Sequence, residues 1–294
     1  MTVSFEQAGP TLAGRVTGVD ATRPLSAEQV REVEAGMDRF AVLVFPGQAL
    51  TDEQQVAFSE SFGALEATGG GNVTPKDQRR LDAKLADVSN LDQYGKPLAR
   101  DDRRRMFNLG NQLWHSDSSF RAVPAKYSIL SGRAVATVGS NTEFADMRAA
   151  YDALDDQTKA EVEDLVCEHS LIYSRGSLGF DDLTAEERAA FAPVRQRLVR
   201  RHPVTGRRSL FLSSHIGTII GWPVPEARAF LRDLTEHATD RRFVYVHKWQ
   251  QYDLMMWDNR QTMHRVRRFD ESQVRDMRRT TVAGDAPTVQ AQAA

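Results

Sequence analysis

The chain contains one cysteine, Cys167, among its 294 residues, so an internal disulfide cannot form. A fold that does not depend on disulfides is typical of a reducing compartment. Cys167 follows Val162, Leu165 and Val166, and this helical spacing of apolar residues predicts a buried thiol on a helix. We therefore expect a structural cysteine.

Long apolar runs are also missing from the sequence. No stretch approaches the roughly 20 residues that a helix needs to cross a bilayer. The N-terminal sequence MTVSFEQAGPTLAG lacks the basic start and the apolar run of a signal peptide. A formal net charge of −2 gives no electrostatic reason to expect a nucleic acid or an anionic membrane as partner. These absences predict a soluble, cytoplasmic protein.

The hydrophobic pattern predicts a mainly β fold with flanking helices, built around a double-stranded β-helix (jelly-roll) core. Short β-like runs are predicted at 41–45, 127–130, 199–202, 209–212, 243–249, 254–257 and 280–283, with a hairpin turn at 204–207. Capping boxes at Ser26, Thr51 and Thr184 start three helices, and further helices are predicted at 147–154, 158–166 and 225–237. Regular βαβ spacing is missing, which disfavours a doubly wound sheet.

Two segments differ in character from the rest of the chain. Residues 68–105 begin with Gly69-Gly70-Gly71 and continue as a polar, charge-rich stretch with few apolar anchors. A loop of this length in a compact domain is usually a functional lid or a disordered segment, and we expect a mobile lid. Residues 285–294 are small and polar and predict a flexible tail. Residues 1–284 are therefore expected to form a single domain.

The short motif His115-Ser116-Asp117 is the first half of a candidate metal site. Alternate side chains of an extended strand point to the same face, so His115 and Asp117 could reach one point in space. Imidazole and carboxylate supply two of the three ligands of the facial triad in non-haem iron(II) oxygenases. Chance makes His-x-Asp common, however, and a surface hydrogen-bonding pair is the alternative interpretation.

His264 supplies the second half of this site. It follows a hydrophobic run and opens a basic stretch that extends from Arg265 to Arg279. Three protein ligands leave three positions on an octahedral iron, enough for a bidentate 2-oxo acid and dioxygen. Arg275 and Arg279 lie on the strand predicted after His264, and a guanidinium matches a carboxylate in two parallel hydrogen bonds. A solvated basic edge is the alternative for this stretch.

Four runs in order along the chain resemble the 2-oxoglutarate-dependent dioxygenases of the taurine dioxygenase superfamily: VLVF at 42–45, NQLWHSDSSF at 111–120, DMRAAYDAL at 146–154 and MWDNR at 256–260. The resemblance covers nearly the whole chain and is strongest toward members that act on aryloxyalkanoates. It implies iron(II) as cofactor, 2-oxoglutarate and dioxygen as co-substrates, and a homo-oligomer. The implied reaction hydroxylates the carbon next to the ether oxygen of a small anionic aromatic substrate and releases a phenol and glyoxylate.

The resemblance also implies roles for single residues. The iron ligands, and with them the catalytic centre, would be His115, Asp117 and His264. The distal carboxylate of 2-oxoglutarate would be held by Arg275 and Thr142, and Asn111, on the strand of the first ligand, would also contact the co-substrate. Thr142 could instead be an ordinary β-branched strand residue, and Asn111 could cap a turn.

On the substrate side, Arg279 matches the arginine that meets the anionic head of the substrate, and Ser118 occupies a substrate-contacting position. Arg278 could exchange roles with Arg279, because neighbouring strand residues face opposite ways. His202 and His215 resemble positions near the pocket, but a structural imidazole is the favoured interpretation of both. The loop at 69–72 stands where the family reaches over its substrate.

Two other functions remain open at this point. A dioxygenase for another small anion, such as taurine or an alkylsulfonate, would need the same iron and 2-oxoglutarate residues. A metal-binding jelly roll without oxygenase activity is the other alternative. Arg275 and Thr142 disfavour it, because a protein that only binds metal has no need of a carboxylate pocket.

Overall fold

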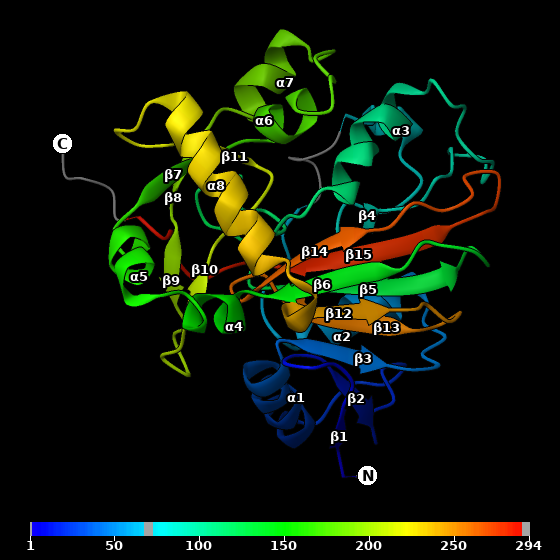
Figure 1. Cartoon of the computed structure of the whole chain (residues 1–294). Helices are drawn as coiled ribbons and strands as arrows, with labels where there is room; N and C mark the ends of the chain where they lie inside the picture. Colours follow the sequence, from blue (N-terminus) through cyan, green and yellow to red (C-terminus); the bar gives the residue numbers. More distant parts are fainter. Residues whose placement is uncertain (1, 68–72, 290–294) are drawn as a thin grey trace.

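The computed structural model describes residues 2–67 and 73–289. Its largest sheet has seven strands in the order β1 (Ser4–Gln7), β2 (Gly14–Thr17), β3 (Val42–Phe45), β13 (Leu254–Asp258), β5 (Tyr127–Ala134), β15 (Asp276–Val282) and β4 (Ala86–Asp87). Neighbours in this sheet are antiparallel except for β2 and β3. The sheet therefore brings segments from both ends of the chain side by side (Figure 1).

Three smaller sheets accompany it. One contains β12 (Val244–His247), β6 (Thr142–Asp146) and β14 (Thr262–Val266), and another contains β11 (Ile216–Ile219), β7 (Val166–His169) and β8 (Val194–Arg197). The predicted hairpin is confirmed, since β9 (Val199–Arg201) and β10 (Arg208–Leu210) pair antiparallel across residues 202–207. β14, which carries His264, pairs with β6, so the hydrogen bonds of this sheet hold His264 in place.

Eight helices flank the sheets in the described residues: α1 (Ala27–Phe40), α2 (Asp52–Glu60), α3 (Arg103–Asn108), α4 (Met147–Asp152), α5 (Asp156–Val162), α6 (Leu171–Gly176), α7 (Ala185–Ala190) and α8 (Val224–Ala238). Short 3-10 turns follow as η2 (Lys76–Gln78), η3 (Leu109–Gln112) and η4 (Arg241–Phe243). All three predicted capping boxes are present, at Ser26, Thr51 and Thr184. Figure 1 shows α1 at the end that carries β1 and β2, and α3 near β4 at the opposite sheet edge. None of the described helices is long and apolar enough to cross a membrane.

The core is divided by the central strands, which are buried on both faces. On β3, Leu43 and Phe45 pack with helix α1 in one cluster, whereas Val42 and Val44 face the opposite cluster. Phe144 of β6 belongs to this second cluster, which therefore fills the space between the seven-stranded sheet and the β12-β6-β14 sheet. Burial on two faces explains why β3 and β13 appear in the sequence as continuous apolar runs instead of alternating patterns.

The prediction that Cys167 lies on a helix is wrong. Helix α5 ends at Val162, and Cys167 lies on β7, where it pairs with both β8 and β11. The apolar spacing that suggested a longer helix belongs to two different elements that bury their side chains in one cluster. The thiol is nevertheless buried, as predicted, and burial raises its pKa to about 12.

The segment predicted as a lid is partly described. Its glycine-rich loop at 68–72, expected to reach over the substrate, lies outside the described residues. The remainder contains η2, β4 and the start of α3, and it buries Val73, Leu85 and Leu91, so it has more apolar anchors than expected. Arg80 forms paired hydrogen bonds of 2.7–3.0 Å to Asp87 and Asp276, which tie the segment to β15.

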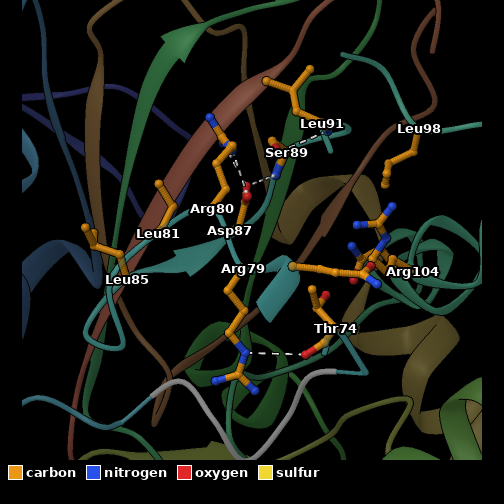
Figure 2. A pocket seen from close by; sticks show the side chains of 12 residues that line it. Thr74, Arg79, Arg80, Leu81, Leu85, Asp87, Ser89, Leu91, Leu98 and Arg104 are labelled. Carbon is orange, nitrogen blue, oxygen red and sulfur yellow. Dashed lines mark hydrogen bonds and ion pairs between the residues drawn. The ribbon is translucent and has the colours of Figure 1, made fainter. Parts of the chain in front are cut away.

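A cavity of about 520 Å³ lies within this segment and includes Arg79, Leu98 and Arg104 (Figure 2). Mobility of the segment stays a prediction.

At the C-terminal end of the chain, Thr288 contacts Gln196 and Arg197 of β8, so residues just before the final five are held against the sheet. The predicted flexibility of residues 290–294 falls outside the described residues.

Candidate metal centre

His115, Asp117 and His264 converge as predicted. Each offers one ligand atom, all three residues are buried, and these atoms lie within 4.8 Å of one another. His264 lies on β14, and the backbones of His115 and His264 exchange two hydrogen bonds of 3.0 and 2.8 Å. This pairing is an isolated bridge, so the expected extended strand at His115 is wrong. The chain instead turns at Asp117 and Ser118, whose φ is +54°, and the turn brings the carboxylate beside the imidazole.

The donor set fits a divalent transition metal. His115 Nδ1 lies 2.8 Å from the carbonyl oxygen of Leu113, which can only accept, so this nitrogen carries the proton and Nε2 is free to coordinate. Burial lowers the pKa of both ligand histidines, which keeps them neutral. Burial opposes the ionisation of Asp117, but the charge of Arg279 and the hydrogen bond from Ser128 favour it, and the pKa of the carboxyl is held at about 2. Two neutral imidazoles and one carboxylate form the facial triad that suits iron(II).

A buried network orients the carboxylate. Ser128 Oγ donates to Asp117 Oδ2 at 2.7 Å, and the Asp117 amide donates to Asn259 Oδ1 at 3.1 Å. Asn259 Nδ2 donates to Ser128 Oγ at 2.9 Å, and the Trp257 indole donates to Asn259 Oδ1 at 3.0 Å. Our sequence reasoning missed Ser128 and Asn259 as positioning residues. For Asn259 a signal was present, because it lies in the family-like run MWDNR.

Strand β15 separates the two neighbouring arginines by direction. Arg278 points toward α2, where Nη1 lies 2.7 Å from both carboxylate oxygens of Asp52 and Nη2 lies 3.0 Å from Asp276. Arg279 points the other way and contacts Oδ1 of Asp117. The structure therefore puts Arg279, and not Arg278, beside the metal ligands.

His115 and Asp117 line a cleft of about 760 Å³. The predicted residues Asn111, Ser118 and Arg279 line it too. Ser118 Oγ donates to Glu66 at 2.7 Å. The cleft also includes residues that our sequence reasoning did not single out for the site, namely Glu66, Phe107, Phe120, Arg121, Leu171 and Arg175. They come from four separate stretches of the chain without a shared motif, and only Phe120 falls in a family-like run.

The predicted co-substrate residues gather around a second cavity of about 480 Å³. Arg275, 4% exposed, lies directly before β15, and its Nη1 donates to the Val88 carbonyl at 2.8 Å. Burial lowers the pKa of Arg275 to about 10, and its Nε has no hydrogen-bond partner among the described residues. Val88 and Asn111 line both this cavity and the metal cleft, so the two spaces adjoin.

Thr142 lies on a strand as predicted, whereas Asn111 does not. Asn111 lies on η3 and not on a strand, and its Oδ1 accepts from Arg175 Nη2 at 3.4 Å. Thr142 lies on β6 opposite Val266, which lines the second cavity. Its hydroxyl accepts a 2.9 Å hydrogen bond from the Trp249 indole. The structure therefore brings Asn111 to the cavity wall and Thr142 to the strand beside it.

The two histidines that resemble family positions have different surroundings. His202 is buried with Nε2 3.3 Å from Asp258, as expected of a structural imidazole. His215 lines the metal cleft, its Nδ1 lies 2.9 Å from Ser174 Oγ, and its ring centroid is 5.8 Å from that of His115. His215 is thus part of the cleft wall.

The family model described as "Taurine catabolism dioxygenase TauD, TfdA family" matches residues 4–281. The chain belongs to this family. Among curated TauD/TfdA relatives, an alpha-ketoglutarate-dependent 2,4-dichlorophenoxyacetate dioxygenase of Cupriavidus pinatubonensis is 46% identical, over 97% of this chain and 99% of the relative. A (S)-phenoxypropionate/alpha-ketoglutarate-dioxygenase of Delftia acidovorans is 35% identical, over 98% and 97%.

Solved structures agree with the family assignment. The crystal structure of AAD-2 in complex with Mn(II) and N-oxalylglycine is 63% identical in sequence and superposes with a TM-score of 0.96, covering 98% of this chain and all of the other. The TauD/TfdA assignment confirms the resemblance drawn from the four sequence runs. It also confirms the prediction of an oxygenase fold of sheets with flanking helices.

Proposed function

We propose that this chain is an iron(II)- and 2-oxoglutarate-dependent dioxygenase that hydroxylates the carbon next to the ether oxygen of aryloxyalkanoates such as 2,4-dichlorophenoxyacetate. The observation that carries the proposal is the convergence of two neutral imidazoles and one ionised carboxylate at a cleft that cationic arginines also line. We further propose that the sheets form the double-stranded β-helix (jelly-roll) core expected from the sequence.

His115, Asp117 and His264 would hold the metal. Iron(II) bound there would supply the reductive activation of dioxygen that couples decarboxylation of 2-oxoglutarate, to succinate and CO₂, with oxidation of the substrate. The protein's part is to present the donors in the correct state. The Leu113 carbonyl fixes the tautomer of His115, and Ser128 orients the carboxylate of Asp117.

Arg275, Thr142 and Asn111 are proposed to hold 2-oxoglutarate in the adjoining cavity. A buried guanidinium with an unsatisfied Nε suits a carboxylate, which accepts two parallel hydrogen bonds. The Mn(II) and N-oxalylglycine in the AAD-2 structure support this proposal, because N-oxalylglycine differs from 2-oxoglutarate by an NH group in place of one CH₂.

The substrate would lie in the metal cleft, where Arg279 and Ser118 are proposed contacts. Hydroxylation of the carbon beside the ether oxygen gives a hemiacetal. Its collapse forms a carbonyl as the hydroxyl proton leaves, breaks the bond to the aryl oxygen, and releases a phenol with glyoxylate, or with pyruvate from a 2-aryloxypropionate. The names of the curated relatives support this substrate class.

We also propose a cytoplasmic location and a homo-oligomeric state. The first is supported by a single, buried cysteine, which suits a reducing compartment. The second rests on the family resemblance alone and is tested by light scattering during gel filtration.

A substrate panel tests the proposed function. The protein with Fe(II), 2-oxoglutarate and oxygen is offered aryloxyacetates, 2-aryloxypropionates and taurine, and phenol, sulfite and succinate are measured. We expect phenol and succinate in equal amounts from aryloxyalkanoates. Sulfite from taurine without phenol from any aryloxy acid would contradict the proposal. In parallel, anaerobic addition of Fe(II) and 2-oxoglutarate should give a charge-transfer absorption band that His115→Ala abolishes.

A further inference from the structure

Arg175, on helix α6, is a buried cation in the wall of the metal cleft. Its side chain is 5% exposed. Nη1 donates to Ser174 Oγ at 3.1 Å, Nη2 donates weakly to Asn111 Oδ1 at 3.4 Å, and Nε has no partner among the described residues. No carboxylate of the described chain lies within ion-pairing distance of it. A buried charge in this situation is costly unless an anion completes its surroundings.

The other arginines of the cleft are already balanced. Arg279 contacts Asp117, and Arg121 pairs with Glu66 at 3.5 Å. Burial lowers the pKa of Arg175 to about 10, with partial compensation from the charge of Asp117, so Arg175 stays charged at neutral pH. Among the described residues that line this cleft, Arg175 therefore offers the guanidinium that no carboxylate neutralises.

The chain is shaped to admit this guanidinium. Gly110 lies against it, and a Cβ placed on Gly110 would be 2.5 Å from Cζ and 2.6 Å from Nη1 of Arg175. The ring of Phe107 also contacts the guanidinium, with its centroid 4.5 Å from Cζ. Any side chain at position 110 would displace the guanidinium. The position of the charge therefore depends on a glycine at 110 and on the aromatic ring of Phe107.

We propose that Arg175 binds the carboxylate of the aryloxyalkanoate substrate and thereby selects acids over neutral aryl ethers; this inference rests on the function proposed above. It replaces the expectation that Arg279 meets this carboxylate, because Asp117 already neutralises Arg279. In an aryloxyacetate the carbon to be oxidised is bonded directly to the carboxylate carbon. A carboxylate anchor must therefore lie in the same cleft as the metal ligands, as Arg175 does beside His115 and Asp117. Phe120 and Leu171 supply an apolar wall for the aryl ring.

The proposal is tested by binding to protein loaded with Mn(II) and N-oxalylglycine, which does not turn over. Tryptophan fluorescence or calorimetry gives the Kd of 2,4-dichlorophenoxyacetate and of its neutral analogue 2-(2,4-dichlorophenoxy)ethanol. Arg175→Gln should weaken binding of the acid by about 10- to 100-fold and change binding of the alcohol by less than about 3-fold. Arg175→Lys should keep part of the acid affinity, and Gly110→Ala should weaken acid binding with the charge still present.

Arg200→Gln is the matched control. Arg200 also stacks on a phenylalanine, with Cζ 4.6 Å from the Phe211 centroid, and burial lowers its pKa to about 10 as well. It lines a different cavity, together with Arg260 and Asp285. This variant should leave the affinities for acid, alcohol and N-oxalylglycine unchanged.

Four results would overturn the inference. Equal loss of acid and alcohol affinity in Arg175→Gln would mean that the side chain only packs the wall. Loss of N-oxalylglycine affinity with acid binding retained would assign Arg175 to the co-substrate. Cleavage of aryloxyacetates by the wild type together with unchanged acid affinity in Arg175→Gln would overturn this inference alone. A wild type that neither binds nor cleaves any aryloxyacetate would overturn the proposed function with it.

Discussion

The two cavities that adjoin at Asn111 share residues of the turns α3 and η3 but differ in the rest of their walls. In the smaller one, the arginine, Arg275, directly precedes β15 and is held by the Val88 carbonyl. The larger one, which His115 and Asp117 line, adds residues of the short helix α6. A sheet fixes side-chain direction through its hydrogen-bond register, whereas short helices and loops can exchange residues without disturbing the strands. The wall that only the larger cavity has therefore suits a substrate that differs among relatives, beside one fixed co-substrate.

Removing a metal ligand should have the largest effect, because the reactions of the co-substrate and of the substrate both need the metal. Asp117→Ala removes the carboxylate that the two histidines and Arg279 surround, and it leaves two neutral donors next to a cation. We expect turnover to fall by at least about 10³-fold and metal binding to be lost. Succinate formation and bound Fe(II) are the measurements. Activity within tenfold of the wild type would show that Asp117 is not a ligand.

A change of Arg275 should affect the ligand of the smaller cavity and leave the ligand of the larger one unaffected. Arg275→Gln keeps a polar side chain near Val88 but removes the buried charge. The KM for 2-oxoglutarate should rise by about 10- to 100-fold, while the KM for the aryloxy acid changes by less than about 3-fold. Arg278→Gln is the control, because Arg278 lies nearby in sequence but points toward Asp52 of α2. An increase confined to the KM of the aryloxy acid would reverse the assignment of the two cavities.

The metal site could be predicted because histidine and aspartate are common metal ligands. Two histidines and an aspartate near a basic stretch are compatible with a metal and an anionic ligand, and the resemblance to the family then implied the same three residues as ligands. Strand β13 was predictable for a related reason, since burial on both faces leaves a continuous apolar run. The direction of Arg279 was not, because a shift of one residue in register exchanges it with Arg278, and pairing of β15 with β5 and β4 fixes that register.

Features that depend on contacts distant in sequence could not be predicted. Arg175 is an isolated arginine in the sequence, and its meaning comes from Gly110 and Phe107, more than 60 residues earlier. Cys167 was assigned to a helix because local spacing cannot tell one long helix from a helix followed by a strand in the same core. The turn at Asp117 was likewise hidden, since His-x-Asp fits both a strand and a turn.

A buried histidine of β7 offers a test of how stability depends on pH. His169, on β7, is buried with no hydrogen-bond partner for either ring nitrogen among the described residues, and burial lowers its pKa to about 3. The unfolded chain takes up a proton near pH 6.5 that the folded chain refuses until about pH 3, so stability falls as pH decreases through this range. His169→Phe keeps a flat ring against Phe211 but cannot take up a proton.

Between pH 7.5 and pH 5 the wild type should therefore lose about 2 kcal/mol more of its free energy of unfolding than His169→Phe does, roughly a 30-fold difference in the unfolding equilibrium. Urea denaturation of both metal-free proteins at the two pH values measures it. The other buried histidines contribute to both proteins and cancel in the difference. Parallel losses in the two proteins would mean that His169 is protonated in the folded state.

The smallest effect tests whether the sheet side of the metal centre is as rigid as its register suggests. Ser128→Ala removes the hydroxyl that donates to Asp117 and accepts from Asn259, while the backbone of β5 stays paired with β13 and β15. Residues that position metal ligands commonly contribute about tenfold to metal affinity, so we expect the affinity for Fe(II) to fall by that amount. The Kd of the aryloxy acid, measured on the Mn(II)-loaded protein, should stay unchanged. The cleft-side control is Ser118→Ala, which removes a hydrogen bond to Glu66 and should alter substrate binding but leave metal affinity intact. If Ser118→Ala instead lowered metal affinity as much as Ser128→Ala does, the metal would depend equally on loop and sheet, and the contrast between the two cavities would not hold at the metal itself.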